Sequence, residues 1–124
     1  MVRRPTEAGY EAAPNIALVK YWGVRDEDLG LPYNSSLSVT LNHLRSRTWV
    51  KFDPTLTEDR FLLGRDEQTD GPLRSVVEFL DEVRALGRFE THAFVRSENN
   101  FQTASGLASS ASGFAALAGA ASLA

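Results

Sequence analysis

The stretch from Asn99 to Gly113 consists almost entirely of small, hydroxyl and amide side chains. A backbone can approach an anion closely only where side-chain bulk is missing. The residues that remove this bulk are Gly106, Ala108, Ala111 and Gly113. The residues that add hydroxyl donors are Thr103, Ser105, Ser109, Ser110 and Ser112. Small residues and hydroxyl donors in one stretch predict a phosphate-binding loop.

Apolar residues recur at helical spacing after this loop, at Leu107, Ala111, Phe114 and Leu117. The loop is therefore expected to open onto a helix N-terminus, whose free N–H groups and positive dipole end attract phosphate. It is not a Walker-type loop, because the Gly-Lys-Ser/Thr ending is missing. The alternative interpretation is a small-residue helix packed tightly in a core behind a flexible loop.

Composition indicates one globular unit, since 43% of the 124 residues are hydrophobic and 23% are charged. Thirteen Lys and Arg against sixteen Asp and Glu argue against a nucleic-acid partner. No cysteine, long apolar run or secretory signal is present, which predicts a cytoplasmic protein without a membrane partner. His43 and His92 have no second ligand at metal-binding spacing, so no protein metal site is expected.

Hydrophobic patterning predicts a mixed α+β fold. Strands are expected at 9–13 and 16–19, paired with each other around Pro14, and at 37–41 as a half-buried strand after a turn at 26–32. A further strand at 47–52 places Thr48, Val50 and Phe52 on one face, and a last one at 91–96 leads into the loop. The clearest helix begins at 70–72, with Pro72 near its first position and Gly87 at C′. Its apolar stripe comprises Leu73, Val76, Val77, Leu80 and Val83.

Residues 115–124 are typical of a helix interior, and the chain stops there without a capping glycine or a closing Lys or Arg. From this pattern we expect a truncated chain, with one sheet face and the last helix underpacked.

Two blocks of the sequence resemble the diphosphomevalonate decarboxylases, members of the GHMP kinase superfamily. Residues 13–41, with Lys20-Tyr21-Trp22-Gly23 at their centre, resemble the N-terminal signature of that family. Asn99 to Gly113 resembles its ATP loop, written Asn-Asn-Phe-Pro-Thr-Ala-Ser-Gly-Leu-Ala-Ser-Ser-Ala. The resemblance implies a GHMP-kinase N-terminal domain of the ribosomal protein S5 domain 2-like type, incomplete here. Residues 1–124 would be its N-terminal part, with the C-terminal domain absent.

The resemblance also implies an activity in isoprenoid biosynthesis by the mevalonate pathway. With ATP and Mg²⁺ as cofactors, such an enzyme decarboxylates mevalonate 5-diphosphate to isopentenyl diphosphate. Asn15 would orient an arginine that faces the substrate carboxylate. The substrate-binding residues carried over are Lys20, Tyr21, Trp22, Gly23 and Val24. The ATP-binding residues carried over are Thr103, Ser105, Gly106, Leu107, Ala108, Ser109 and Ser110.

The residue types of the first block fit this assignment. Lys20 supplies charge, Tyr21 a hydroxyl and Trp22 an apolar wall, a combination that suits a small anionic substrate such as a phosphorylated mevalonate. The alternative interpretation is structural, because Trp and Tyr often fill sheet cores.

Three positions qualify the resemblance. Val24 stands where the family usually has lysine, which removes a cation from the expected diphosphate pocket. Gln102 replaces the proline of the family loop. Arg74 lies close to the position of a family arginine that contacts substrate phosphate, about one residue out of register. Three alternatives are therefore kept: a phosphomevalonate decarboxylase, another GHMP small-molecule kinase, and a non-catalytic fragment or subunit. For the complete protein, the resemblance implies a homodimer as one assembly.

No catalytic base can be assigned within the sequence. Three adjacent acids, Asp26, Glu27 and Asp28, are typical of a solvated turn rather than of a tuned base. The catalytic residues are expected beyond Ala124, and the isolated chain is expected to be inactive.

Overall fold

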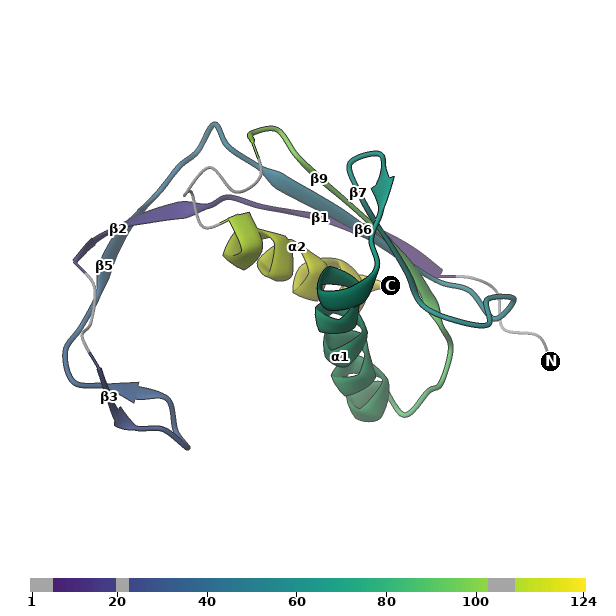
Figure 1. Cartoon of the computed structure of the whole chain (residues 1–124), viewed down its shortest axis with the longest axis horizontal. Helices are drawn as coiled ribbons and strands as arrows, with labels where there is room; N and C mark the ends of the chain where they lie inside the picture. The colour runs from purple at the N-terminus through teal and green to yellow at the C-terminus, as the bar shows by residue number, and fades with distance from the viewer. Residues whose placement is uncertain (1–5, 20–22, 103–108) are drawn as a thin grey trace.

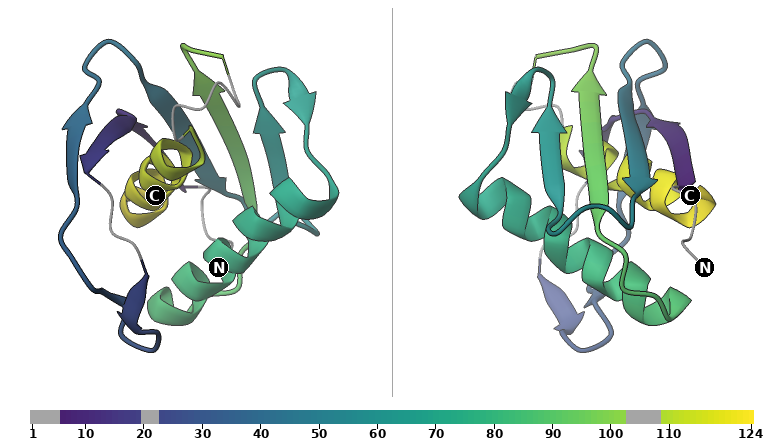
Figure 2. Two further views of the ribbon diagram at one scale, coloured as in Figure 1. Left: turned by 60° about the vertical axis from the view of Figure 1, so that its left-hand side comes forward. Right: turned by 90° about the vertical axis from the view of Figure 1, so that its right-hand side faces the viewer.

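The computed structural model describes residues 6–19, 23–102 and 109–124. Its main sheet has five strands in the order β1-β6-β9-β7-β8. Helices α1 (Asp70–Gly87) and α2 (Ser109–Leu123) lie on the same face of this sheet (Figure 1, Figure 2). The expected α+β class is therefore confirmed. The strands are β1 (Thr6–Ala12), β6 (Ser46–Phe52), β7 (Arg60–Leu63), β8 (Asp66–Glu67) and β9 (Ala93–Asn99).

Strands β6 and β9 form the centre of the sheet, and alternate residues of both point toward the helices. The antiparallel register pairs Phe52 with Ala93 and Val50 with Val95 at one end. The same face continues as Thr48 opposite Ser97 and Ser46 opposite Asn99. Because strand side chains alternate between faces, the predicted inward face of 47–52 is confirmed, and it extends to Ser46.

Helix α1 connects β7 to β9, which run parallel to each other, so the three elements form a βαβ unit. Val76 and Leu80 are buried, and Leu73, Val77 and Val83 are half-buried, so the predicted apolar stripe faces the core. Pro72 lies in the first turn, as expected.

The end of α1 differs from the prediction. Gly87 is the last helical residue, and Arg88 adopts the left-handed conformation with φ 55°. The glycine is needed for another reason, because a Cβ at Gly87 would lie 2.5 Å from the ring of Phe89. That ring packs edge-to-face on Phe52 with centroids 4.9 Å apart, which anchors the turn between α1 and β9 to the core.

Helix α2 packs across β1 and β6 with a different face from the one predicted. Ala111 and Phe114 are exposed, and the buried positions are Ser112, Ala116, Leu117, Ala120 and Ala121. The spacing is still helical, but alanine is apolar enough for either face, so the contacts with the sheet decide the orientation. The alternative of a tightly packed small-residue helix is thus correct for residues 116–121.

A long two-stranded arm extends from the sheet and bends toward its helix-covered side (Figure 1). It contains β2 (Asn15–Val19) paired with β5 (Leu37–Thr40), and a hairpin of β3 (Val24–Asp26) and β4 (Leu31–Pro32). The predicted pairing of 9–13 with 16–19 is wrong, because β1 pairs with β6 and β2 with β5. A two-residue hairpin turn needs positive φ, which Pro14 cannot adopt.

The prediction of a half-buried strand at 37–41 is also wrong for most of its length. Leu37 is 58% exposed and Val39 48% exposed, since the described chain places no helix or strand over this part of the arm. The turn predicted at 26–32 is confirmed as the β3–β4 connection, closed by the Leu29 N–H donating to Asp26 Oδ1 at 3.0 Å.

Two glycines of α2 provide a matched test of how this helix packs. A Cβ at Gly113 would meet no atom within 4 Å, whereas a Cβ at Gly119 would overlap the ring of Tyr10. We expect Gly113→Ala to raise the free energy of unfolding by about 0.5–1 kcal/mol, the usual gain in helix propensity. Gly119→Ala should lower it, because the overlap outweighs that gain. Urea denaturation followed by circular dichroism measures both; equal effects of the two substitutions would contradict the packing described here.

Candidate functional site

The connection from β9 to α2 carries the predicted phosphate-binding loop. Strand β9 ends at Asn99 and α2 begins at Ser109, so the chain passes from the sheet centre into a helix N-terminus. Ser109 and Ser110 form the first turn of α2, where backbone N–H groups have no partner within the helix. The other predicted ATP-binding residues lie outside the described residues: Thr103, Ser105, Gly106, Leu107 and Ala108.

Asn100 fixes the approach to this loop. Its Oδ1 accepts from the Arg45 N–H at 2.7 Å, and its Nδ2 donates to the His43 carbonyl at 2.9 Å. Its own N–H donates to the Arg45 carbonyl at 3.1 Å. Three hydrogen bonds therefore tie Asn100 to the connection between β5 and β6, although its side chain is exposed.

A cavity of about 400 Å³ lies between the sheet and the beginnings of both helices. Phe61, Leu63, Pro72, Phe114 and Leu117 give it apolar walls, and Ser75, Thr48, Ser97 and Asn99 add hydroxyl and amide groups. Gly113 of α2 and Gly71 of α1 also line it, with open space at both Cβ positions. Mostly apolar walls with a few polar groups are typical of small-molecule pockets.

Ser46 links the two sides of the loop connection. Its hydroxyl donates to Asn99 Oδ1 at 2.6 Å and is 2.8 Å from the hydroxyl of Ser112. Ser46 and Ser112 are both buried, with exposures of 0% and 3%. The expectation that Ser112 supplies a hydroxyl to the phosphate site is therefore wrong. It faces the sheet because it shares the buried face of α2.

The predicted substrate residues lie on the arm. Asn15 begins β2, and its Nδ2 donates to Ser38 Oγ at 3.1 Å across the β2–β5 pair. Gly23 has φ +86°, a conformation that favours glycine, and it leads directly into Val24, which is 41% exposed at the start of β3. Lys20, Tyr21 and Trp22 lie outside the described residues.

Arg74 lies near the start of α1 with its side chain exposed, and in the described part of the chain no hydrogen bond or ion pair holds it. The start of α1 and the start of α2 border the same cavity. The structure therefore brings together the beginning of α1, the end of β9 and the beginning of α2. The described contacts do not join Asn15, Gly23 or Val24 to them.

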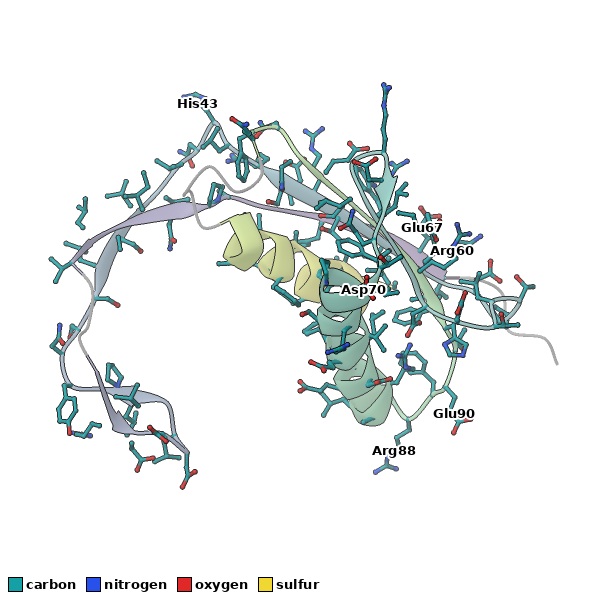
Figure 3. The ribbon with its side chains drawn as sticks, viewed as in Figure 1. His43, Arg60, Glu67, Asp70, Arg88 and Glu90 are labelled. Carbon is teal, nitrogen blue, oxygen red and sulfur yellow. The ribbon has the colours of Figure 1, made fainter. Side chains whose placement is uncertain are left out.

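None of the described residues that line this cavity is charged. Figure 3 shows His43 at the bend between β5 and β6, far from Arg88 and Glu90 at the end of α1. Within residues 6–19, 23–102 and 109–124, His, Cys, Asp and Glu form no group of three or more that could hold a metal ion.

Ion pairs at Arg60 and at Arg84 change pKa values without involving the cavity. Arg60 donates to both oxygens of Glu67 at 2.8 and 3.2 Å, which lowers the pKa of the Glu67 carboxyl (Figure 3). Burial opposes the charge of Arg84, but its hydrogen bonds to Asp59 and Asp81 raise the pKa of the guanidinium above its ordinary value. The buried Arg84–Asp59 pair joins α1 to the residue before β7.

A sheet with two helices on one face, and a small-residue segment that leads into α2, is the arrangement that the resemblance to the GHMP kinase class implies. Comparison with known proteins confirms and narrows this class. A family model described as the diphosphomevalonate decarboxylase-like N-terminal domain matches residues 12–124. The chain belongs to this family.

Individual relatives agree with the family match. The diphosphomevalonate decarboxylase of Ganoderma lucidum is 47% identical, over 90% of this chain and 31% of that protein. The crystal structure of mevalonate diphosphate decarboxylase from Staphylococcus aureus is 40% identical with a TM-score of 0.86, over 97% of this chain and 36% of that one. MDDEF, solved in complex with MVAPP, AMPPCP and magnesium, is 45% identical with a TM-score of 0.84, over 97% of this chain and 37% of that one. The chain thus spans about a third of the length of these relatives.

Among the described residues, no helix is both long and apolar enough to span a membrane.

Sequence reasoning missed the cavity and the role of Ser46. Extending the alternation of Thr48, Val50 and Phe52 two residues toward the N-terminus would have placed Ser46 on the inward face. No local signal could have found the cavity, because its lining comes from β6, β7, β9, α1 and α2.

Proposed function

We propose that this chain is the nucleotide-binding and substrate-binding N-terminal part of an ATP-dependent decarboxylase that acts on mevalonate 5-diphosphate. The observation that carries the proposal is that the chain passes from the central strand β9 to the N-terminus of α2 beside a largely apolar cavity. The complex of MDDEF, similar over 97% of this chain, supports both ligands, since it contains mevalonate diphosphate and an ATP analogue with magnesium.

The described residues fit ATP in two ways. Phosphates suit the start of α2, because the first N–H groups of a helix have no partner within the helix and the positive end of its dipole favours negative charge. The nucleoside suits the adjoining cavity, where Phe61, Leu63 and Phe114 offer apolar contact and Ser75 and Ser97 offer hydrogen bonds. The proposed phosphate-binding residues are Thr103, Ser105, Gly106, Leu107, Ala108, Ser109 and Ser110.

Magnesium fits this arrangement as a companion of the nucleotide. Mg²⁺ usually keeps several waters and is held by substrate phosphates with few protein oxygens. Because Ser109 and Ser110 are among the proposed phosphate-binding residues, the ion would lie with the phosphates at the start of α2. Bound there, the ion would neutralise phosphate charge during transfer.

The arm would hold the second substrate. The proposed contacts of the mevalonate phosphates are Lys20, Tyr21, Trp22, Gly23 and Val24, with Arg74 as an additional cation and Asn15 as an orienting residue.

In the proposed reaction, the γ-phosphoryl group of ATP is transferred to the tertiary hydroxyl of the substrate. Loss of that phosphate together with CO₂ leaves the alkene, isopentenyl diphosphate.

A base and a cation at the substrate carboxylate complete this chemistry, and the described residues offer no assigned candidate for either. We therefore place these groups in the part of the relatives that this chain does not span. The 124-residue polypeptide is accordingly proposed to bind ATP without turnover, and the complete enzyme to act in the cytoplasm, where a homodimer is one possible assembly.

A chimera tests the proposed function directly. This chain would replace the corresponding part of the S. aureus decarboxylase, which it matches with a TM-score of 0.86. We expect ATP-dependent CO₂ release from mevalonate 5-diphosphate. ATP consumption without CO₂ would instead indicate a kinase, and a monodisperse, folded chimera that consumes no ATP would contradict the proposal.

Gly106→Val tests the phosphate-binding loop in the same chimera. A branched side chain prevents close approach of backbone N–H groups to phosphate, and loss of such electrostatic contacts typically costs about 100-fold or more in turnover. We expect a raised KM for ATP or loss of turnover. The control is Gly30→Asn, at an exposed turn glycine with φ +64° that asparagine tolerates. Unchanged ATP kinetics of a folded Gly106→Val variant would exclude the assigned loop.

Val24 favours a second candidate, a decarboxylase that prefers mevalonate 5-phosphate. Its half-exposed apolar side chain begins β3 where a lysine would add a cation for the distal phosphate. We expect Val24→Lys to increase the preference for the diphosphate over the monophosphate by about 10-fold, measured as a ratio of kcat/KM values. Equal ratios for the two forms would show that position 24 does not face the phosphates.

A further inference from the structure

A row of hydroxyl and amide groups joins α2 to β9, with Ser46 and Ser112 buried and Asn99 half-buried. Ser46 has a single hydroxyl proton, and it is donated to Asn99 Oδ1 at 2.6 Å. The contact of 2.8 Å with Ser112 therefore requires the Ser112 hydroxyl to donate to Ser46 Oγ. The row runs in one direction, from Ser112 through Ser46 to Asn99, and such chains of hydrogen bonds strengthen one another.

The three residues of this row lie on the elements that border the segment between β9 and α2. Asn99 is the last residue of β9, and Ser112 lies in the first turn of α2, so they stand on the two sides of the loop. Ser46 begins β6 and is fully buried, on the rigid centre of the sheet. One buried hydroxyl thereby sets the separation between the strand that enters the loop and the helix that leaves it.

A second buried hydroxyl pair shows that the link to α2 is specific. Thr48 and Ser97 are the next inward pair along the same strands, and their hydroxyl groups are also 2.8 Å apart. That pair joins β6 only to β9. Of these two cross-strand pairs, only Ser46–Asn99 has a further hydrogen bond to α2, through Ser112.

We propose that Ser46 and Ser112 are positioning residues for nucleotide binding, which hold the start of α2, where phosphate is proposed to bind, against β6 and β9. Neither serine contacts the nucleotide. This role rests on the proposed ATP site, and it adds to that site two residues whose side chains face the core.

Ser112→Ala is the most direct test, because alanine suits a helix interior and leaves the hydrogen bond from Ser46 to Asn99 intact. Amide hydrogen exchange of the 124-residue chain without nucleotide gives the first readout. We expect exchange in the first hydrogen-bonded turn of α2, residues 113–116, to become about 3- to 10-fold faster, the factor expected for one lost hydrogen bond. Exchange in residues 119–123 should not change.

Ser97→Ala is the matched control for this exchange experiment, because it removes a buried hydroxyl pair of the same length that does not reach α2. It should leave exchange at 113–116 unchanged. Ser46→Ala breaks the row at its centre and should reproduce the effect of Ser112→Ala. Unchanged exchange at 113–116 in the folded Ser112→Ala chain would overturn the proposal.

MgATP affinity, measured by calorimetry on the same chains, gives the second readout. We expect the Kd of Ser112→Ala to rise about 3- to 10-fold, with Ser122→Ala, an exposed serine near the end of α2, remaining at the wild-type value. A general loss of stability would not change Kd in this selective way. Wild-type affinity in Ser112→Ala, together with faster exchange, would overturn the positioning role. Absence of MgATP binding by the wild type would instead contradict the proposed ATP site, and the exchange experiment would still decide whether the row holds α2.

Discussion

The register between β6 and β9 is the constraint on which the rest of this structure depends. It aligns four cross-strand pairs on the face that the helices cover, and their character changes along the strands. Phe52 with Ala93 and Val50 with Val95 are apolar, whereas Thr48 with Ser97 and Ser46 with Asn99 are polar. A shift of one residue would turn all of them to the opposite face of the sheet. The register thus creates a hydrophobic core at one end and a polar end beside the loop connection.

Helix α2 fits both ends of this face because its buried residues are small. Ala116, Ala120 and Ala121 allow the helix to approach the sheet closely over the apolar part. One turn earlier, Ser112 meets the polar part, where its buried hydroxyl lies 2.8 Å from that of Ser46. A buried polar group without a partner would be costly, so the polar end of the face suits a buried serine. Small residues consequently serve two purposes in this segment, close packing of α2 and the proposed approach to phosphate.

The arm differs from the main sheet in how much of its apolar surface is buried. Its strands β2 and β5 are held by backbone pairing, while large apolar side chains such as Leu18 and Leu37 are 63% and 58% exposed. The main sheet, in contrast, buries Val50 and Val95 almost completely. The cavity proposed for the nucleoside therefore belongs to the well-packed part of the described chain. Gly23 and Val24, two of the proposed substrate contacts, belong to the arm, which has little packing of its own.

Local sequence determined the elements whose signals are local. The apolar stripe of α1, the alternation in β6 and the turn before β4 could all be identified from residue types and spacing. The resemblance of residues 13–41 and 99–113 to the decarboxylases identified the family, because long motifs carry information that composition does not.

Tertiary structure decided everything that depends on which surfaces meet. The pairing of β1 with β6 and the exposure of Leu37 could not follow from alternation, which is the same for any partner strand. Gly87 was correctly recognised as significant but for the wrong reason, since the Phe89 ring requires it. The orientation of α2 was undetermined in the sequence because alanine is compatible with either face. Because Ser112 shares the buried face of α2, it points into the core, where its hydroxyl lies beside that of Ser46, 66 positions earlier in the chain.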